Sequence, residues 1–201
     1  MKKVAIFGGS FDPVHNGHIS LAKDAADEVG LDELIFMPAY IQPFKQGHDT
    51  TECNHRLAML RAVTEEDTRF AVSNYELRTR GISYTYKMLR AVKAAYDVDD
   101  RLYFMCGTDS FLNIEIWKEA EELLENYYYI IGVRPGYKEV ELDETIKRIH
   151  AEHGTSIVKI HNRRIDVSST EVRKKLANDE NVNGMIPSYI KWYIKANGLY
   201  K

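Results

Sequence analysis

The stretch Gly8-Gly9-Ser10-Phe11-Asp12-Pro13-Val14-His15-Asn16-Gly17-His18 decides the fold of this chain. The apolar run 4–7 before it is rich in β-forming residues and predicts a buried strand. The segment after it repeats apolar residues at steps of three and four, which predicts an amphipathic helix. The stretch therefore predicts a strand–loop–helix unit, and Asn16 is the expected N-cap of the helix.

The loop of this unit carries groups that suit an anion. Gly8 and Gly9 let the backbone approach a ligand closely. His15 and His18 lie beside a helix start, where free N–H groups and the helix dipole favour phosphate. The loop contains neither G-x-x-x-x-G-K-[ST] nor G-x-G-x-x-G. A histidine pair that binds a metal ion and a solvated loop are the alternatives.

The composition is that of an ordinary soluble domain. The chain has 201 residues, 44% of them hydrophobic, and a net charge of −3, which predicts one domain with an ample core. The mildly acidic balance disfavours a nucleic-acid surface, so any anion site must be local. Cys53 and Cys106 form no C-x-x-C motif and are expected to be reduced thiols.

The sequence also carries signals about location. It contains no apolar run long enough to span a membrane, and its start does not resemble a signal peptide. We therefore expect a cytoplasmic protein that binds neither nucleic acid nor a membrane. The oligomeric state is not determined by the sequence, and a homo-oligomer stays open.

Strands and helices alternate along the rest of the chain. Further strands are expected at 34–37, 70–72, 102–105, 127–133 and 156–160, with helices between them. This alternation predicts an α/β fold, Rossmann-like and doubly wound, with a mainly parallel sheet of about six strands. Residues 1–201 should form a single domain whose last part, about 165–201, is a small helical subdomain.

Several loops after predicted strands carry candidate binding residues. Lys45 lies in a long loop, 39–50, although it could equally be an exposed lysine. Thr85 lies at a helix start expected near Ser83, where the ordinary role is a cap. His55 and Arg56 are expected to be surface groups rather than part of a pocket.

Three further candidates come from the second half of the chain. Asp109 follows a strand and Gly107, where a carboxylate suits ribose hydroxyls, and its rival role is an N-cap. Trp117 is by type more often a core residue than a platform for a ligand. Arg134 follows a strand and could bind phosphate or serve a structural hydrogen bond.

A second diagnostic stretch is Ser168-Ser169-Thr170-Glu171-Val172-Arg173. Ser168 and Glu171 have the spacing of a capping box, so a helix should begin here. Capping does not explain three consecutive hydroxyl groups with an arginine one turn later. Hydroxyls, free N–H groups and a guanidinium at one helix start predict a site that holds a triphosphate.

Together these motifs resemble the nucleotidyltransferase α/β superfamily, in the form found in bacterial nicotinate-nucleotide adenylyltransferases. The resemblance runs from Gly8 to Tyr200. It rests on the opening loop, the P-x-x-x-x-P-x-K at 38–45, the S-Y-T at 83–85, the Trp before 121–124, the R-P-G at 134–136, the S-S-T-x-x-R at 168–173 and the final I-P and L-Y pairs.

The resemblance implies a reaction and a set of site residues. The reaction is transfer of AMP from ATP to nicotinate mononucleotide, giving deamido-NAD and pyrophosphate, with Mg2+ bound through the ATP phosphates. The implied catalytic residues are His15, His18 and Arg173. The implied ATP-binding residues are Gly8, Gly9, Ser10, Phe11, His15, His18, Gly107, Asp109, Ser168, Ser169, Thr170 and Arg173. The implied residues for nicotinate mononucleotide are Lys45, Thr85, Trp117 and Arg134, and no protein metal site is implied.

The acceptor phosphate is already an anion, so the reaction needs no strong base, and we expect in-line displacement without a covalent intermediate. Lys118 stands where the family usually has Tyr, and Cys106 where it often has Gly or Ala. The lysine could offer charge to the nicotinate carboxylate. Rival acceptors are nicotinamide mononucleotide and phosphopantetheine. The second is disfavoured, because the related enzymes that act on phosphopantetheine are shorter and lack S-S-T-x-x-R. A rival of another class is a nucleotide-binding protein without activity.

Overall fold

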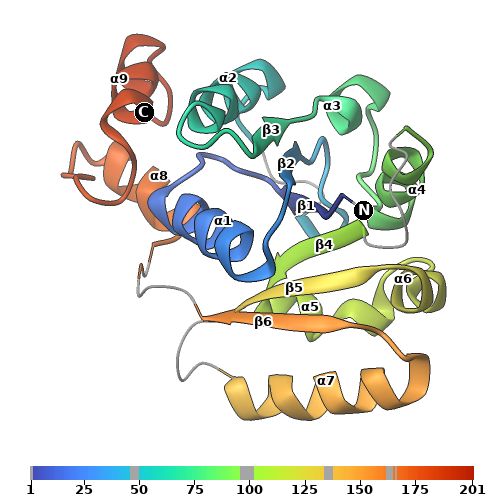
Figure 1. Ribbon diagram of the computed structural model, residues 1–201. Helices are drawn as coiled ribbons and strands as arrows, with labels where there is room; N and C mark the ends of the chain where they lie inside the picture. Colours follow the sequence, from blue (N-terminus) through green and yellow to red (C-terminus); the bar gives the residue numbers. More distant parts are fainter. Residues whose placement is uncertain (1, 46–49, 96–101, 134–137, 162–164, 166) are drawn as a thin grey trace.

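The computed structural model describes residues 2–45, 50–95, 102–133, 138–161, 165 and 167–201 (Figure 1). Its strands form one sheet in the order β3-β2-β1-β4-β5-β6, and each neighbouring pair is parallel. This arrangement confirms the predicted doubly wound α/β fold. The strands are β1 Val4–Gly9, β2 Glu33–Pro38, β3 Phe70–Val72, β4 Leu102–Gly107, β5 Tyr128–Val133 and β6 Ile157–His161.

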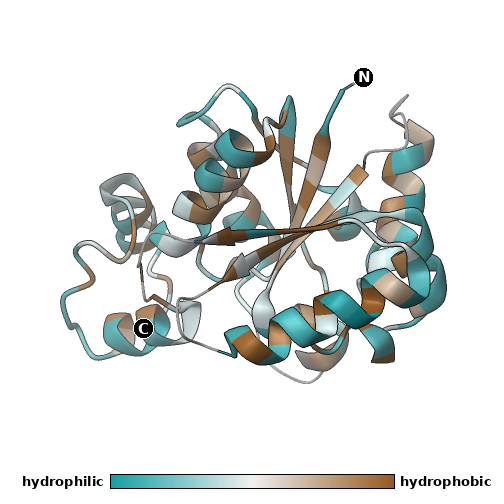
Figure 2. Cartoon of the chain, turned by 60° about the horizontal axis from the view of Figure 1, so that its bottom comes forward, coloured by the Kyte–Doolittle hydropathy of each residue, from teal (hydrophilic) through white to brown (hydrophobic). Residues whose placement is uncertain are grey.

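Helices cover both faces of the sheet. Side chains of α1 (Asn16–Val29), α2 (Cys53–Thr64), α8 (Ser169–Ala177) and α9 (Ser188–Ala196) belong to one core cluster. Side chains of α4 (Thr85–Ala95), α5 (Thr108–Phe111), α6 (Ala120–Asn126) and α7 (Glu139–His153) belong to the other. Figure 2 shows the strands, mostly hydrophobic, between helices whose outer sides are hydrophilic.

Strand β1 explains why its sequence is an unbroken apolar run. Ala5 and Phe7 face one core cluster, while Val4 and Ile6 face the other. A parallel strand with helices on both sides is buried on both faces, so it cannot alternate between apolar and polar residues.

The ends of several helices differ from the expected positions. α1 is capped by His15 rather than Asn16, and it ends at Gly30, whose φ is 66°. α2 has Glu52 as its N-cap. The short helix α3 (Tyr75–Thr79) was missed, because five residues are too few to show a helical period.

The C-terminal part of the chain lies beside α1 and α2 (Figure 1). Val172, Ile190 and Ile194 belong to the same core cluster as β1 and α1. The N–H of Asn16 also donates to the carbonyl of Met185 at 2.9 Å. Helices α8 and α9 therefore share the main core rather than forming one of their own. No helix in the described ranges is long and apolar enough to cross a membrane.

Candidate active site

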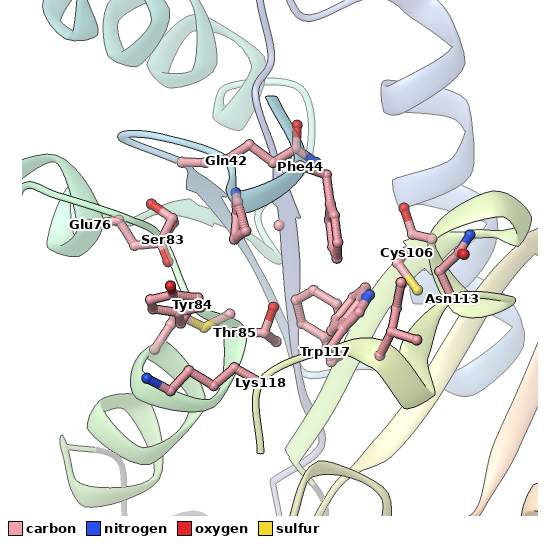
Figure 3. Close-up of a pocket in the computed structure, with 18 of the residues that line it drawn as sticks. Gln42, Phe44, Glu76, Ser83, Tyr84, Thr85, Cys106, Asn113, Trp117 and Lys118 are labelled. Carbon is pink, nitrogen blue, oxygen red and sulfur yellow. The ribbon is translucent and has the colours of Figure 1, made fainter. Parts of the chain in front are cut away.

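A cavity of about 600 Å³ opens at the carboxyl ends of β1 and β4 (Figure 3). The strand order reverses between these two strands, which is where open α/β sheets bind ligands. The volume is that of a small-molecule site. The lining brings together five of the predicted site residues, namely Gly8, Gly9, Thr85, Asp109 and Trp117.

Trp117 forms an aromatic wall of this cavity (Figure 3). Its ring packs edge to face against Phe104, with 5.8 Å between the centroids. Its indole Nε1 is buried and has no hydrogen-bond partner among the described residues. A buried N–H normally has a hydrogen-bond acceptor. The indole N–H of Trp117 therefore marks a place where a bound ligand or a water molecule would supply one.

Thr85 is the first residue of α4 and lines the same cavity. Free N–H groups at a helix start favour an anion, so this wall suits a carboxylate. Asp109 lies within α5, whose N-cap is Gly107, so its ordinary alternative role as a cap is excluded. Its carboxylate is exposed at the cavity, with the ammonium of Lys138 at 3.6 Å.

Gly107 does not line the cavity, but it adjoins open space at the end of β4. A Cβ at this position would meet no heavy atom within 4 Å. The glycine is therefore not required by packing in the protein itself, and a ligand could approach the backbone there.

The two histidines of the opening loop hold each other by mutual capping. The N–H of His18 donates to Nδ1 of His15 at 3.4 Å, and the N–H of His15 donates to Nδ1 of His18 at 3.3 Å. Their rings stack with 3.6 Å between centroids. Because each Nδ1 accepts a hydrogen bond, each neutral ring carries its proton on Nε2. The pair therefore offers two parallel N–H donors, which suits a phosphate better than a metal ion.

The neighbours of this pair fix the rings in place. A Cβ at Gly17 would lie 3.1 Å from both Cε1 and Nδ1 of His15, so a larger residue here would press on the stacked ring. Phe11 is buried in the core, and its ring meets that of His18 edge to face at 5.0 Å. The Phe11 side chain thus supports His18 from behind, and only its backbone remains for the predicted contact with ATP. The Ser10 hydroxyl donates to Oε1 of Gln42 at 3.1 Å.

The start of α8 docks directly onto the opening loop. Ser168 is the N-cap of α8 and accepts from the N–H of Glu171 at 3.2 Å. The Ser169 hydroxyl donates to the carbonyl of Pro13 at 2.9 Å. Arg173 donates to the carbonyl of Asp12 at 2.6 Å and to the Thr170 hydroxyl at 3.5 Å. The structure therefore brings the two diagnostic motifs together, although neither the histidines nor residues 168–173 line the cavity itself.

Asp12 joins three parts of the chain, a role that the sequence did not reveal. Its carboxylate is buried, with 3% of the residue exposed. It accepts from the hydroxyl of Tyr200 at 2.6 Å and from the N–H of Thr51 at 3.2 Å. Together with the bond from Arg173, these contacts attach the start of α2, the start of α8 and the C-terminus to the opening loop.

Arg56 is not the surface residue that was expected. It is 1% exposed, and its guanidinium donates to the carbonyls of Ser10, Ala39 and Thr51 at 2.8–2.9 Å. These three carbonyl oxygens accept hydrogen bonds from the guanidinium, and they offset the free-energy cost of burying its charge in the protein. The position in the first turn of a helix gave no signal of this, because the partners are distant in sequence.

The charged groups of the cavity wall are Lys118, Glu76 and Asp109. The ammonium of Lys118 lies 5.1 Å from the ring centroid of Tyr84. Burial raises the pKa of Glu76 to about 7 against the opposing effect of a hydrogen bond from Ser83. Burial raises the pKa of the Cys106 thiol to about 12, so this departure from the family pattern adds a neutral, apolar group.

Two predicted residues cannot be placed in the site. Lys45 ends the 3-10 helix Pro43–Lys45, but its side chain lies outside the described residues. Arg134 also lies outside them. Within the described part of the chain, no three His, Cys, Asp or Glu residues gather closely enough to hold a metal ion.

Comparisons with known proteins agree with this geometry. Residues 6–175 match the family model described as Cytidylyltransferase-like. The chain is 34% identical over 201 residues to the "Probable nicotinate-nucleotide adenylyltransferase" of Clostridium novyi (strain NT), covering 100% of both chains. It is 33% identical to the protein of the same name from Thermoanaerobacter sp. (strain X514), covering 99% of this chain and 94% of that protein.

A solved structure supports the fold. The Plasmodium falciparum nicotinic acid mononucleotide adenylyltransferase complexed with NaAD superposes with a TM-score of 0.80 at 23% identity, covering 100% of this chain and 98% of that one. At this identity the likeness concerns the fold alone. The family model and the relatives, by contrast, cover nearly the whole chain, so the protein belongs to the Cytidylyltransferase-like family and, within it, to the nicotinate-nucleotide adenylyltransferases.

Proposed function

We propose that this protein transfers AMP from ATP to nicotinate mononucleotide and releases deamido-NAD and pyrophosphate. The observation that carries the proposal is the continuity of two half-sites along one loop. Gly8 and Gly9 line the cavity, and the same loop continues to the stacked pair His15 and His18 and to the docked start of α8. A phosphate-bearing acceptor in the cavity would thus meet the phosphates of ATP at this loop.

The phosphate half-site supplies donors without a base. Nε2–H groups of His15 and His18 would donate to ATP phosphate oxygens, and the guanidinium of Arg173 would hold the leaving pyrophosphate. Arg173 has five N–H donors, and among the described residues Nη1 and Nη2 each make one hydrogen bond to a protein partner. The hydroxyls of Ser168 and Thr170 and the N–H groups of the helix start, including that of Ser169, would complete this grip. The Ser169 hydroxyl itself donates to the carbonyl of Pro13 and so holds the helix start in place.

The reaction would be an in-line displacement at the α-phosphorus. An oxygen of the acceptor phosphate forms the new P–O bond, while the bond from the α-phosphorus to the bridging oxygen breaks and pyrophosphate leaves. The attacking group is already anionic at neutral pH, so no proton has to be removed. Catalysis would come from positioning and from donors that stabilise charge on the transferred phosphoryl group.

The acceptor half-site has the chemistry of an aromatic acid. Trp117 offers a ring face, Thr85 a helix start and Lys118 an ammonium group, all in the lining of one cavity. Asp109 and the open space at Gly107 would serve ribose and backbone contacts of ATP. Lys45 and Arg134 remain proposed contacts of the acceptor on the strength of the sequence alone.

Magnesium would enter the reaction as part of the substrate. The side chains around the phosphate half-site donate hydrogen bonds, which fits phosphate oxygens, and those that the structure describes provide no cage of carboxylates for a cation. The ion would therefore be bound by ATP, where it neutralises phosphate charge. Our proposal assigns no residue of the chain as a magnesium ligand.

A pyrophosphate-release assay tests the proposal. The purified protein is given ATP and magnesium with nicotinate mononucleotide, nicotinamide mononucleotide or phosphopantetheine. We expect pyrophosphate release to be fastest with the nicotinate compound and deamido-NAD to form in equal amount. ATP binding without pyrophosphate release from any acceptor would instead indicate a nucleotide-binding protein without this activity.

A further inference from the structure

Glu76 is a buried acid in the wall of the acceptor cavity (Figure 3). It lies on α3 and is 8% exposed, whereas the carboxylate of Asp109 is 64% exposed. Figure 3 shows Glu76 next to Ser83, on the same side of the cavity as Tyr84 and Thr85. A carboxyl group in this wall is unexpected, because the proposed acceptor is itself a carboxylate and two like charges in one cavity repel each other.

The carboxyl group of Glu76 ends a chain of hydrogen bonds that joins three segments. The hydroxyl of Ser83 lies next to it (Figure 3) and, as a hydrogen-bonding neighbour, opposes the effect of burial on its pKa. The Ser83 oxygen in turn accepts from the N–H of Tyr40 at 2.9 Å, and the N–H of Ser83 donates to the carbonyl of Ile41 at 2.9 Å. The chain therefore ties α3, the segment after β2 and the start of α4 to one another, and Thr85 follows Ser83 by two residues.

Burial is the largest influence on the charge state of Glu76, and the hydroxyl of Ser83 opposes it. The titratable side chains on the surrounding elements are Tyr75, Arg78, Arg80, Tyr84, Lys87, Tyr40, Lys118 and Asp109. Among the described residues none of them forms an ion pair with Glu76, and Arg78 and Arg80 line a different cavity. Burial raises the pKa of Glu76 to about 7, so the group changes charge in the neutral range.

We propose that Glu76 is a positioning residue that, through Ser83, holds the start of α4 in place for the carboxylate of the acceptor, and that it favours the acceptor only as a neutral carboxyl group. This inference rests on the proposed function. The neutral group still accepts from Ser83 and adds no charge to the cavity. The ionised group repels the carboxylate of nicotinate mononucleotide, so acceptor binding weakens as Glu76 ionises.

The test compares Glu76→Gln with the wild type by steady-state pyrophosphate release from pH 6.5 to 8.5, with saturating Mg·ATP and varied nicotinate mononucleotide. A glutamine oxygen can accept from Ser83 but cannot ionise. For the wild type, KM for the acceptor should rise by up to about fivefold between pH 7 and pH 8, the limit for a single ionisation at this pKa, with kcat little changed. For Glu76→Gln, KM should stay near the low-pH value throughout.

Matched variants separate this role from a purely structural one. Glu125→Gln removes an exposed carboxylate outside the cavity and should follow the wild-type profile. The acceptor phosphate titrates in the same way in all three proteins, so the difference between profiles isolates Glu76. Glu76→Ala removes the acceptor of the Ser83 hydroxyl and should raise KM for nicotinate mononucleotide at pH 6.5, where the wild-type group is mostly neutral, with KM for ATP unchanged.

The inference is overturned if Glu76→Gln keeps the wild-type rise of KM with pH. It is also overturned if the folded Glu76→Ala protein has the wild-type KM at pH 6.5. If Glu76→Ala does not fold, the Glu76→Gln profile decides alone. A wild-type protein that releases no pyrophosphate with any mononucleotide would overturn the proposed function itself, which is a different result from an active enzyme indifferent to Glu76.

Discussion

At the scale of single residues, buried groups that titrate have consequences for stability that do not depend on function. Glu76 has a pKa raised from 4.5 to about 7 in the folded protein. Between these values the folded state binds more protons than the unfolded state, so the free energy of unfolding falls as pH rises. The contribution of Glu76 is thus most favourable at acid pH and is lost as pH rises through about 7.

Glutamine cannot ionise, so Glu76→Gln should be more favourable relative to the wild type at pH 8 than at pH 5. The difference in free energy of unfolding between variant and wild type should change by roughly 2 kcal/mol between these pH values, since one pKa unit corresponds to about 1.4 kcal/mol. Urea unfolding of both proteins at the two pH values measures this difference. An equal effect of the substitution at both pH values would contradict the raised pKa, and Glu125→Gln provides the baseline.

Lys118 and Lys87 allow a matched test of the cavity's charge. Both ammonium groups lie over the ring of Tyr84, at 5.1 Å and 5.7 Å, but only Lys118 lines the cavity. Lys118→Gln should raise KM for nicotinate mononucleotide about five- to tenfold, the size expected for the loss of one hydrogen bond of about 1–1.4 kcal/mol, and should leave KM for ATP unchanged. Lys87→Gln should leave both unchanged. Equal KM values for the acid in all three proteins would exclude a role of Lys118 in recognition.

At the scale of elements, the start of α1 shows how a helix cap can prepare a catalytic group. Capping usually uses a small hydroxyl or carboxamide side chain. Here two imidazoles cap each other's N–H, which fixes ring position and proton location in one arrangement. The arrangement also accounts for the glycine in H-N-G-H, because a Cβ at Gly17 would lie only 3.1 Å from the His15 ring.

His18→Ala should lower kcat about 10²–10³-fold, the usual cost of removing one positioned donor at a developing charge, with a smaller effect on ATP binding. Because His18 also caps the N–H of His15, stability should fall by about 1 kcal/mol, and thermal unfolding measures this separately. His153→Ala, in the last turn of α7, is the control and should retain kcat. A folded His18→Ala protein with kcat near that of the wild type would refute the proposed role.

At the scale of the whole molecule, the succession of strands and helices along the chain followed from the sequence, because most elements are long enough or apolar enough to be recognised. β1, β4 and β5 are continuous apolar runs, and α1 repeats apolar residues at helical spacing. Part of the cavity could also be anticipated, since Gly8 lies at the end of β1, Asp109 follows β4 and Thr85 begins α4. Trp117 was expected in the site only from the family resemblance.

What escaped prediction depends on contacts between distant segments. Arginine is a residue type usually found on the surface, so the sequence predicted an exposed Arg56. Only the folded chain brings the carbonyls of Ser10 and Ala39 to its guanidinium. Glu76 lies in a helix too short for periodicity to detect, and its burial comes from the segments around α3 and α4. Asp12 was part of a recognised motif, yet nothing in that motif points to Tyr200, 188 residues away.

The bond between Asp12 and Tyr200 suggests that the C-terminus stabilises the active-site loop. Burial and the bond to Asp12 raise the pKa of Tyr200 well above its usual value, so the hydroxyl remains a donor at every pH at which the protein is folded. Tyr200→Phe would leave the buried carboxylate of Asp12 without one of its donors. Such a loss costs about 1–3 kcal/mol, so the midpoint of urea unfolding should fall accordingly.

Tyr189→Phe is the matched control for this last prediction. Its hydroxyl also joins the C-terminal part of the chain to an earlier segment by donating to a carboxylate, but the acceptor, Glu66, is exposed. Water can replace that donor, so its removal should cost less than about 0.5 kcal/mol. Because Asp12 also carries the carbonyl bonded by Arg173, Tyr200→Phe should in addition raise KM for ATP, whereas Tyr189→Phe should not. Equal stability losses in the two variants would mean that the C-terminus is held by packing alone. Tyr200 would then not stabilise the loop after β1 that contains Asp12.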